Sequence, residues 1–115
     1  MDRAKAKSAI EELVKAGAMA LTAHAKVRSP AQGKNPLTRE EIKNCLLRGS
    51  ITEGPAPDMR QTNGWRVTVT RFRSEEKHEV AAVLILEQRV LVITGYGWET
   101  NVARRTGRMV EDDDE

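Results

Sequence analysis

His24 and Arg28 are the two residues of this chain whose types and spacing best suit chemistry. Histidine is the side chain whose unperturbed pKa allows proton exchange near neutral pH, and a guanidinium can hold a phosphate through paired hydrogen bonds. In a helix, residues four apart share one face, so the two side chains would meet at one anion. The pair therefore suggests acid–base chemistry on RNA.

RNA can be cleaved without a metal ion when the ribose 2′-hydroxyl attacks its own phosphate. The reaction needs a base for that proton, an acid for the leaving oxygen and cations for the phosphoryl charge. We expect His24 to act as general acid or base, Arg28 to hold the phosphate, and Tyr96 to donate a second proton or stack on a base. Further contacts with RNA are expected from two cations and one aromatic residue, namely Arg66, Arg71 and Trp98.

Each candidate also has an ordinary structural interpretation. Arg28 would form an ion pair with an acid such as Glu41, and Tyr96 would pack in the core. His78 follows several charged residues, which predicts a solvated side chain in a turn. Cys45 has no neighbour that would activate a thiolate, so it is expected to be a small core residue.

The composition is that of one globular domain without metal or disulfide cross-links. A chain of 115 residues, 39% of them hydrophobic, can bury a single core. A single cysteine excludes an intrachain disulfide, and two histidines cannot complete a zinc site of Cys and His ligands. We therefore expect no metal and no other cofactor. The N-terminus lacks an apolar stretch and no apolar run is long enough to span a bilayer, which predicts a cytoplasmic protein without a membrane partner.

The formal net charge of +2 conceals an acidic tail of five residues at 111–115. Without that tail, 19 basic residues face 12 acidic ones, which leaves a net charge of +7. A body this basic attracts polyanions, of which RNA is a common example, although surface lysines and arginines also serve solubility alone. The tail itself is expected to be disordered, together with the basic stretch before it.

The N-terminal half shows two helical patterns. Ile10, Leu13 and Val14 fall on one face of a helix that should end near Gly17, with Ser8 and Glu11 forming a capping box. The short apolar stretch 19–25 fits either a strand or the entry into a helix that carries His24 and Arg28. A loop rich in Pro and Gly follows at 29–36.

The second helix is predicted at 39–48. Thr38 and Glu41 can form a capping box, and Leu37 with Ile42 can form a hydrophobic staple across it. Gly49 follows as the residue type that accepts a left-handed conformation at a helix end. The apolar face of this helix contains Cys45.

The C-terminal half reads as strands. After a loop predicted at 53–64, residues 65–72 alternate, with Trp65 and Val67 on one face and Arg66 on the other. The stretches 80–86 and 90–94 have apolar residues on both faces, as expected for central strands. Turns are predicted at 74–78 and 87–88. These patterns predict an α+β domain at 1–100, in which N-terminal helices pack on an antiparallel meander of three to four strands, followed by a tail at 101–115.

In this order, the elements resemble the RelE-like toxins, with kinship to the BrnT and MqsR families. The matching motifs are the helix 10–17, the sequence His24-Ala25-x-x-Arg28, the helix 37–47 before Gly49 and the closing strand 90–96, and together they span residues 8–98. The resemblance implies a RelE-like fold and a bacterial ribonuclease toxin. It also implies two partners: RNA, including mRNA on the ribosome, and a cognate antitoxin protein.

The chain departs from that family at one point. Relatives continue the His-Ala-x-x-Arg segment with a second arginine, whereas this chain has a Pro- and Gly-rich stretch in which Lys34 is the only cation. Lys34 is therefore the expected replacement contact to RNA. Two alternatives follow from the missing arginine: a nucleic-acid-binding protein that does not cleave, or a protein-interaction module that uses a strand edge or the acidic tail.

Overall fold

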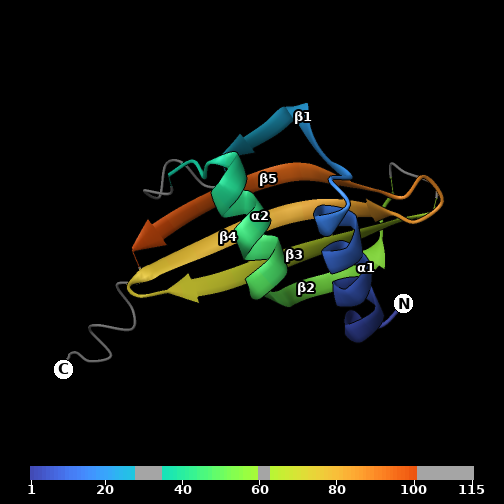
Figure 1. Cartoon of the computed structure of the whole chain (residues 1–115), viewed down its shortest axis with the longest axis horizontal. Helices are drawn as coiled ribbons and strands as arrows, with labels where there is room; N and C mark the ends of the chain where they lie inside the picture. Colours follow the sequence, from blue (N-terminus) through green and yellow to red (C-terminus); the bar gives the residue numbers. More distant parts are fainter. Residues whose placement is uncertain (28–34, 60–62, 101–115) are drawn as a thin grey trace.

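A computed structural model describes residues 1–27, 35–59 and 63–100 of the chain. These residues form a five-stranded sheet and two helices (Figure 1). The elements follow the chain in the order α1 (Arg3–Lys15), β1 (Met19–Val27), α2 (Arg39–Arg48), β2 (Ser50–Pro57), β3 (Gly64–Arg73), β4 (Glu76–Ile85) and β5 (Val90–Thr100). The predicted α+β class is confirmed, and the tail at 101–115 lies outside the described residues.

The sheet has the strand order β1-β5-β4-β3-β2, in which β1 runs parallel to β5 and all other neighbours are antiparallel. The prediction of three to four strands after both helices is wrong, because β1 precedes α2 and β2 occupies the first half of the predicted loop 53–64. Both additional strands are edge strands. Pro55 and Pro57 are compatible with β2 because an edge strand leaves one side of its backbone unpaired.

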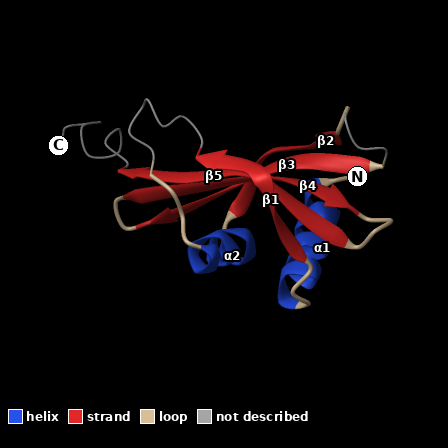
Figure 2. Ribbon diagram, turned by 90° about the horizontal axis from the view of Figure 1, so that it is seen from above, coloured by secondary structure: helices blue, strands red, loops and turns tan. Residues whose placement is uncertain are grey.

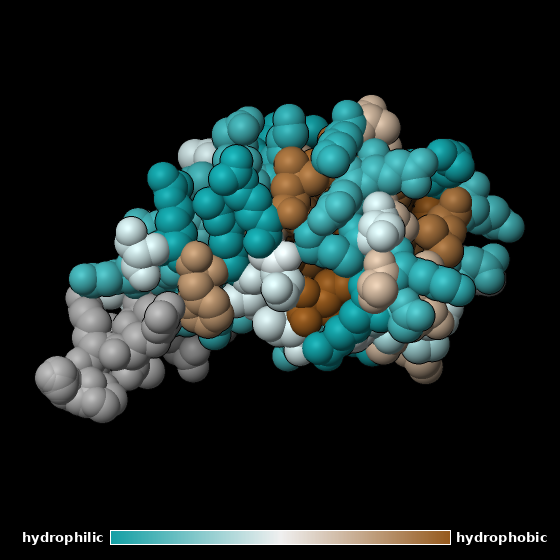
Figure 3. Space-filling view, turned by 60° about the horizontal axis from the view of Figure 1, so that its bottom comes forward, coloured by the Kyte–Doolittle hydropathy of each residue, from teal (hydrophilic) through white to brown (hydrophobic). Residues whose placement is uncertain are grey.

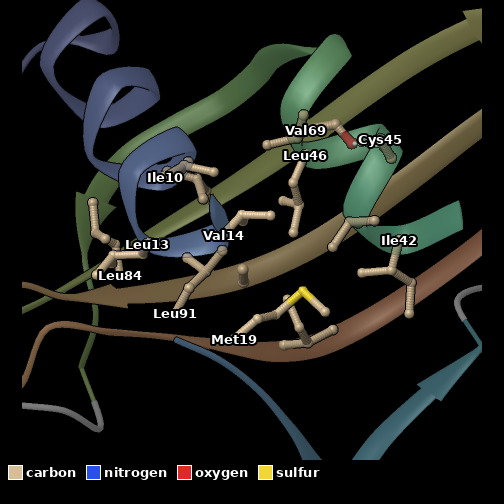
Figure 4. Close-up of a cluster of buried hydrophobic side chains, with 14 of the residues drawn as sticks. Ile10, Leu13, Val14, Met19, Ile42, Cys45, Leu46, Val69, Leu84 and Leu91 are labelled. Carbon is tan, nitrogen blue, oxygen red and sulfur yellow. Dashed lines mark hydrogen bonds between the residues drawn. The ribbon is translucent and has the colours of Figure 1, made fainter. Parts of the chain in front are cut away.

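Both helices pack on the same face of the sheet (Figure 2). The core between them is formed by the apolar faces of α1 and α2 and by alternate residues of the strands (Figure 4). Its largest fully buried members are Ile10, Ile42, Leu46, Leu84, Leu91 and Ile93. The alternation predicted for β3 is confirmed, since Val67 and Val69 belong to this core. The prediction that residues 80–86 and 90–94 form central strands is confirmed as well.

The start of α1 differs from the prediction, and its end agrees with it. The Asp2 side chain caps the helix by accepting a hydrogen bond from the Lys5 backbone at 2.8 Å, so Ser8 lies inside the helix instead of at its start. The helix ends one residue before Ala16, and Gly17 has a φ of +76°. This left-handed backbone favours glycine, which explains why the chain leaves α1 at that residue.

α2 has the predicted bounds and the predicted capping box. Thr38 Oγ1 accepts from the Glu41 backbone at 3.1 Å, and the Glu41 carboxylate accepts from the Thr38 backbone at 2.9 Å. The expected role of Gly49 is wrong, because its φ is −83°. A Cβ at this residue would lie 2.6 Å from the carbonyl oxygens of both Cys45 and Thr70. Gly49 is thus required for the close approach of α2 to β3.

Candidate functional site

His24 lies on a strand, which removes the helical spacing expected to bring it to Arg28. Residues Met19–Val27 are extended as β1, so the helical alternative for this stretch is wrong. The His24 side chain, Arg28 and Lys34 lie outside the described part of the structure. What is described is the backbone of His24 and the strand beside it.

The backbone around His24 is irregular. Leu21 pairs with Ile93 and Lys26 pairs with Gly95. The chain therefore advances five residues in β1 while it advances only two in β5. Thr94 is also an extra residue in β5 relative to β4, since the register shifts between Ala81 and Ala82. Bulges of this kind are frequent beside active sites because they redirect side chains that a regular strand would hold in alternation.

Beyond this irregular region, β5 carries both aromatic candidates on the helix-bearing face. Tyr96 pairs with Val27 of β1 on one side and with Val80 of β4 on the other. Tyr96 and Trp98 are partly buried against the core. The structure therefore confirms the packing interpretation of Tyr96 and leaves part of each ring accessible.

Arg71, His78 and Trp98 form a row across three neighbouring strands. Arg71 pairs with His78, and His78 pairs with Trp98, so the three side chains lie side by side on one face. The imidazole and indole centroids are 6.5 Å apart at an interplanar angle of 41°. The row lies beside α2, since Cys45 of that helix contacts the His78 carbonyl oxygen at 3.6 Å. It combines a cation and an aromatic ring that both suit RNA.

The prediction of a solvated His78 side chain is wrong. His78 is 1% exposed within β4, because that strand begins at Glu76, inside the predicted turn 74–78. Its Nε2 lies 2.7 Å from Glu76 Oε1, and its buried Nδ1 has no hydrogen-bond partner among the described residues. An Nε2–H that donates to the carboxylate satisfies one ring nitrogen only. His78 is in phase with the buried Val80, and that alternation was the signal available in the sequence.

Cys45 is a core residue, as expected. Its side chain is fully buried, and Sγ donates to the carbonyl oxygens of Val69 at 3.5 Å and His78 at 3.6 Å. Burial raises the pKa of the thiol to about 12, although the nearby Arg71 charge acts in the opposite direction. The thiolate needed for nucleophilic chemistry is therefore absent near neutral pH.

Arg66 lies on the opposite face of the sheet from Arg71. The two residues are five apart in a strand whose pairing with β4 is regular throughout, so their side chains point to opposite sides. A single bound phosphate cannot contact both of them. Arg66 instead lines a groove on the face without helices, where its Nε lies 3.8 Å from Asp58 Oδ1.

This groove has a volume of about 820 Å³. Its lining combines small or apolar residues of the central strands with hydroxyl and charged groups of the edges, including Thr22, Glu53, Asp58, Arg66, Ala81, Val83, Val92 and Thr94. On the Glu53 side, Oε1 accepts a hydrogen bond of 2.8 Å from Thr68. The face of the sheet without helices thus has a groove that extends from the edge strand β2 across β3 toward the central strands.

Charge within the described residues is nearly balanced. They contain 13 Lys and Arg against 12 Asp and Glu, so most of the basic excess of residues 1–110 belongs to residues outside them. The side of the molecule with the helices and the β2 edge is mainly hydrophilic, with apolar side chains in small separate areas (Figure 3). In residues 1–27, 35–59 and 63–100, no three His, Cys, Asp or Glu side chains are grouped as a metal site would require.

Comparison of the chain with protein-family models, with curated proteins and with solved structures gives no match. None of the helices in the described ranges has the length and apolar character needed to cross a membrane.

Proposed function

We propose that this chain is a ribonuclease toxin of a toxin–antitoxin system, related to the RelE-like toxins, which cleaves RNA without a metal ion. The observation that supports this proposal is the parallel pairing of β1 with β5. It places the irregular strand that carries His24 beside the end of β5 that carries Tyr96. The two residues expected to move protons thus belong to adjacent strands.

In this proposal the RNA lies across the helix-bearing end of β5. His24 takes the proton of the ribose 2′-hydroxyl, whose oxygen attacks the adjacent phosphorus and displaces the 5′-oxygen. That oxygen takes a proton from Tyr96, and the products are a cyclic phosphate and a free 5′-hydroxyl. Arg71 stabilises the phosphoryl charge and Trp98 stacks on a base, while Arg28 and Lys34 supply further cations. Acid–base catalysis of this kind contributes about 10²- to 10⁴-fold in rate.

Cleavage of a fluorescent RNA in the presence of EDTA tests the proposal. The native chain should cleave, and His24→Ala should lose at least about 100-fold in rate while its melting temperature stays unchanged. Tyr96→Phe keeps the packing ring and removes only the hydroxyl, so a lower rate for this variant would assign the hydroxyl a chemical role. Equal rates for the native and His24→Ala proteins would contradict the proposed mechanism.

A non-catalytic nucleic-acid-binding protein is the second candidate. The absence of the family's second arginine favours it, since Lys34 is the only cation in the stretch that replaces it. This candidate predicts RNA binding that weakens steeply with salt, without cleavage at any protein concentration.

A further inference from the structure

Among the described residues, the groove on the uncovered face is lined by more negative than positive charge. Its lining has two carboxylates, Glu53 and Asp58, and one guanidinium, Arg66. A nucleic-acid backbone would be repelled by this surplus. The groove therefore suits a cation, in contrast to the RNA surface proposed for the opposite face.

Both carboxylates retain capacity to bind a cation. The Asp58 side chain is only 8% exposed, yet its contact with Arg66 is 3.8 Å, well beyond the 2.7–2.9 Å or so of a charge-assisted hydrogen bond. Among the described residues, no side chain or backbone N–H donates to the Asp58 carboxylate within hydrogen-bond distance. Glu53 uses one oxygen for Thr68, and its second oxygen accepts nothing from the described part of the chain. A carboxylate as buried as that of Asp58 normally has such partners.

The rest of the groove is suited to an apolar stem. Ala81, Val83 and Val92 line it from the central strands, and Met59, which is 94% exposed, lines it after the edge strand β2. A lysine or arginine side chain has the matching structure, because its methylene stem packs on apolar surface while its head binds a carboxylate. A volume of about 820 Å³ also exceeds what one such side chain fills, which leaves room for the neighbouring residues of a peptide.

We propose that the groove binds a basic and partly apolar segment of a partner protein, with an arginine or lysine head between Glu53 and Asp58. In the bound segment, the apolar residues that alternate with this basic residue cover Val83, Val92 and Met59. This inference goes beyond the proposed ribonuclease function, because it assigns a protein partner to the face of the sheet opposite the RNA. Occupation of the groove would also cover the face that the helices leave open.

Titration of the full ¹⁵N-labelled chain with the blocked pentapeptide acetyl-Val-Arg-Val-Arg-Val-amide tests this proposal. The expected result is saturable shifts of the Thr22, Ala81 and Thr94 amide signals. Asp58→Asn preserves shape and should weaken binding by about tenfold or more, since a desolvated charge pair is lost. Glu40→Gln removes one carboxylate from α2, on the other face of the sheet, and should leave the affinity unchanged.

Three outcomes would overturn the proposal. The first is that the pentapeptide with Glu in place of Arg binds as tightly as the basic pentapeptide. The second is that agmatine binds as tightly as the basic pentapeptide. The third is that an RNA oligonucleotide shifts the same amide signals of the groove. If Asp58→Asn does not fold, the exposed Glu53→Gln replaces it, and an unchanged affinity in that variant also counts against the groove. RNA cleavage by Asp58→Asn should equal that of the native chain, so failure of the groove proposal is separable from failure of the ribonuclease proposal.

Discussion

At the scale of single residues, the chemistry of this protein depends on which groups are shielded from water. Cys45 and His78 lie together in the core, where the thiol donates to the His78 carbonyl and the imidazole binds Glu76. Neither residue can touch RNA in this arrangement. Among the described residues proposed to contact RNA on this face, Tyr96, Trp98 and Arg71 are each only partly buried.

The buried thiol makes stability depend on alkaline pH. The pKa of Cys45 rises from its ordinary value of 9.0 to about 12 on folding, so the folded chain holds the thiol proton at pH values where the unfolded chain has lost it. This contribution to stability is complete below pH 9 and is lost as the pH rises toward 12. In urea titrations from pH 8 to 11, Cys45→Ala should lose stability less steeply than the native chain. Parallel slopes for both proteins would show that the thiol does not have a raised pKa.

Two glycines should respond differently to substitution. Gly49→Ala places a methyl group 2.6 Å from two carbonyl oxygens and should destabilise the fold by about 1–3 kcal/mol. Gly17 has a φ of +76° and open space around its Cβ position. Asn tolerates that backbone, so Gly17→Asn should lower the melting temperature much less than Gly49→Asn does. Equal losses for the two Asn variants would contradict the packing at Gly49.

At the scale of elements, α2 shows how local sequence can determine a helix. Its capping box uses only residues Thr38 to Glu41, and the flanking Leu37 and Ile42 are both buried in the core. These interactions are local, so the bounds of α2 were predictable.

Removal of the α2 cap should be measurable. Thr38→Ala removes the side-chain acceptor of the Glu41 amide and should destabilise the chain by about 1 kcal/mol. Thr38→Ser keeps a hydroxyl at the cap and should remain within a few tenths of a kcal/mol of the native chain. Chemical denaturation compares the three proteins, and an unchanged midpoint for Thr38→Ala would contradict the role of the cap.

The edge strands could not be predicted in the same way. β1 is a strand because residues 19–21 pair with 91–93, which are about 70 positions later in the chain. β2 contains prolines that locally indicate a loop, and its pairing with β3 decides otherwise. The burial of His78 was missed because the turn before β4 is shorter than the charged residues suggested. For the candidate RNA contacts, the alternation of residues 65–72 had already put Arg66 on the face opposite Val67. Because Arg71 is in phase with Val67, the same pattern could have shown that Arg66 and Arg71 do not share a face.

At the scale of the whole molecule, the sheet separates two surfaces. The helices cover one face, and at its end lie the side chains proposed to bind RNA. The other face has the groove, whose described lining residues carry two carboxylates and one guanidinium. In the two proposals, RNA and a basic protein segment occupy opposite faces of the sheet, so the binding of one would leave the surface for the other open.

This separation predicts different effects for two arginines of one strand. Arg71→Ala should weaken binding of single-stranded RNA and reduce the slope of log affinity against log salt by about 0.7, the value for one lost phosphate contact. Arg66→Ala removes the same charge from the opposite face and should leave both quantities unchanged. Fluorescence anisotropy at several salt concentrations provides the measurement, and equal losses for the two variants would contradict the assignment of RNA to the helix-bearing face.

The most direct test of the central claim is RNA cleavage by the purified chain in EDTA, compared with that of His24→Ala. We predict cleavage by the native chain that leaves a 2′,3′-cyclic phosphate, because the 2′-hydroxyl is the nucleophile, and loss of cleavage in a variant that is still folded. RNA that remains intact at every concentration of the native protein, or is cleaved equally by His24→Ala, would contradict the claim.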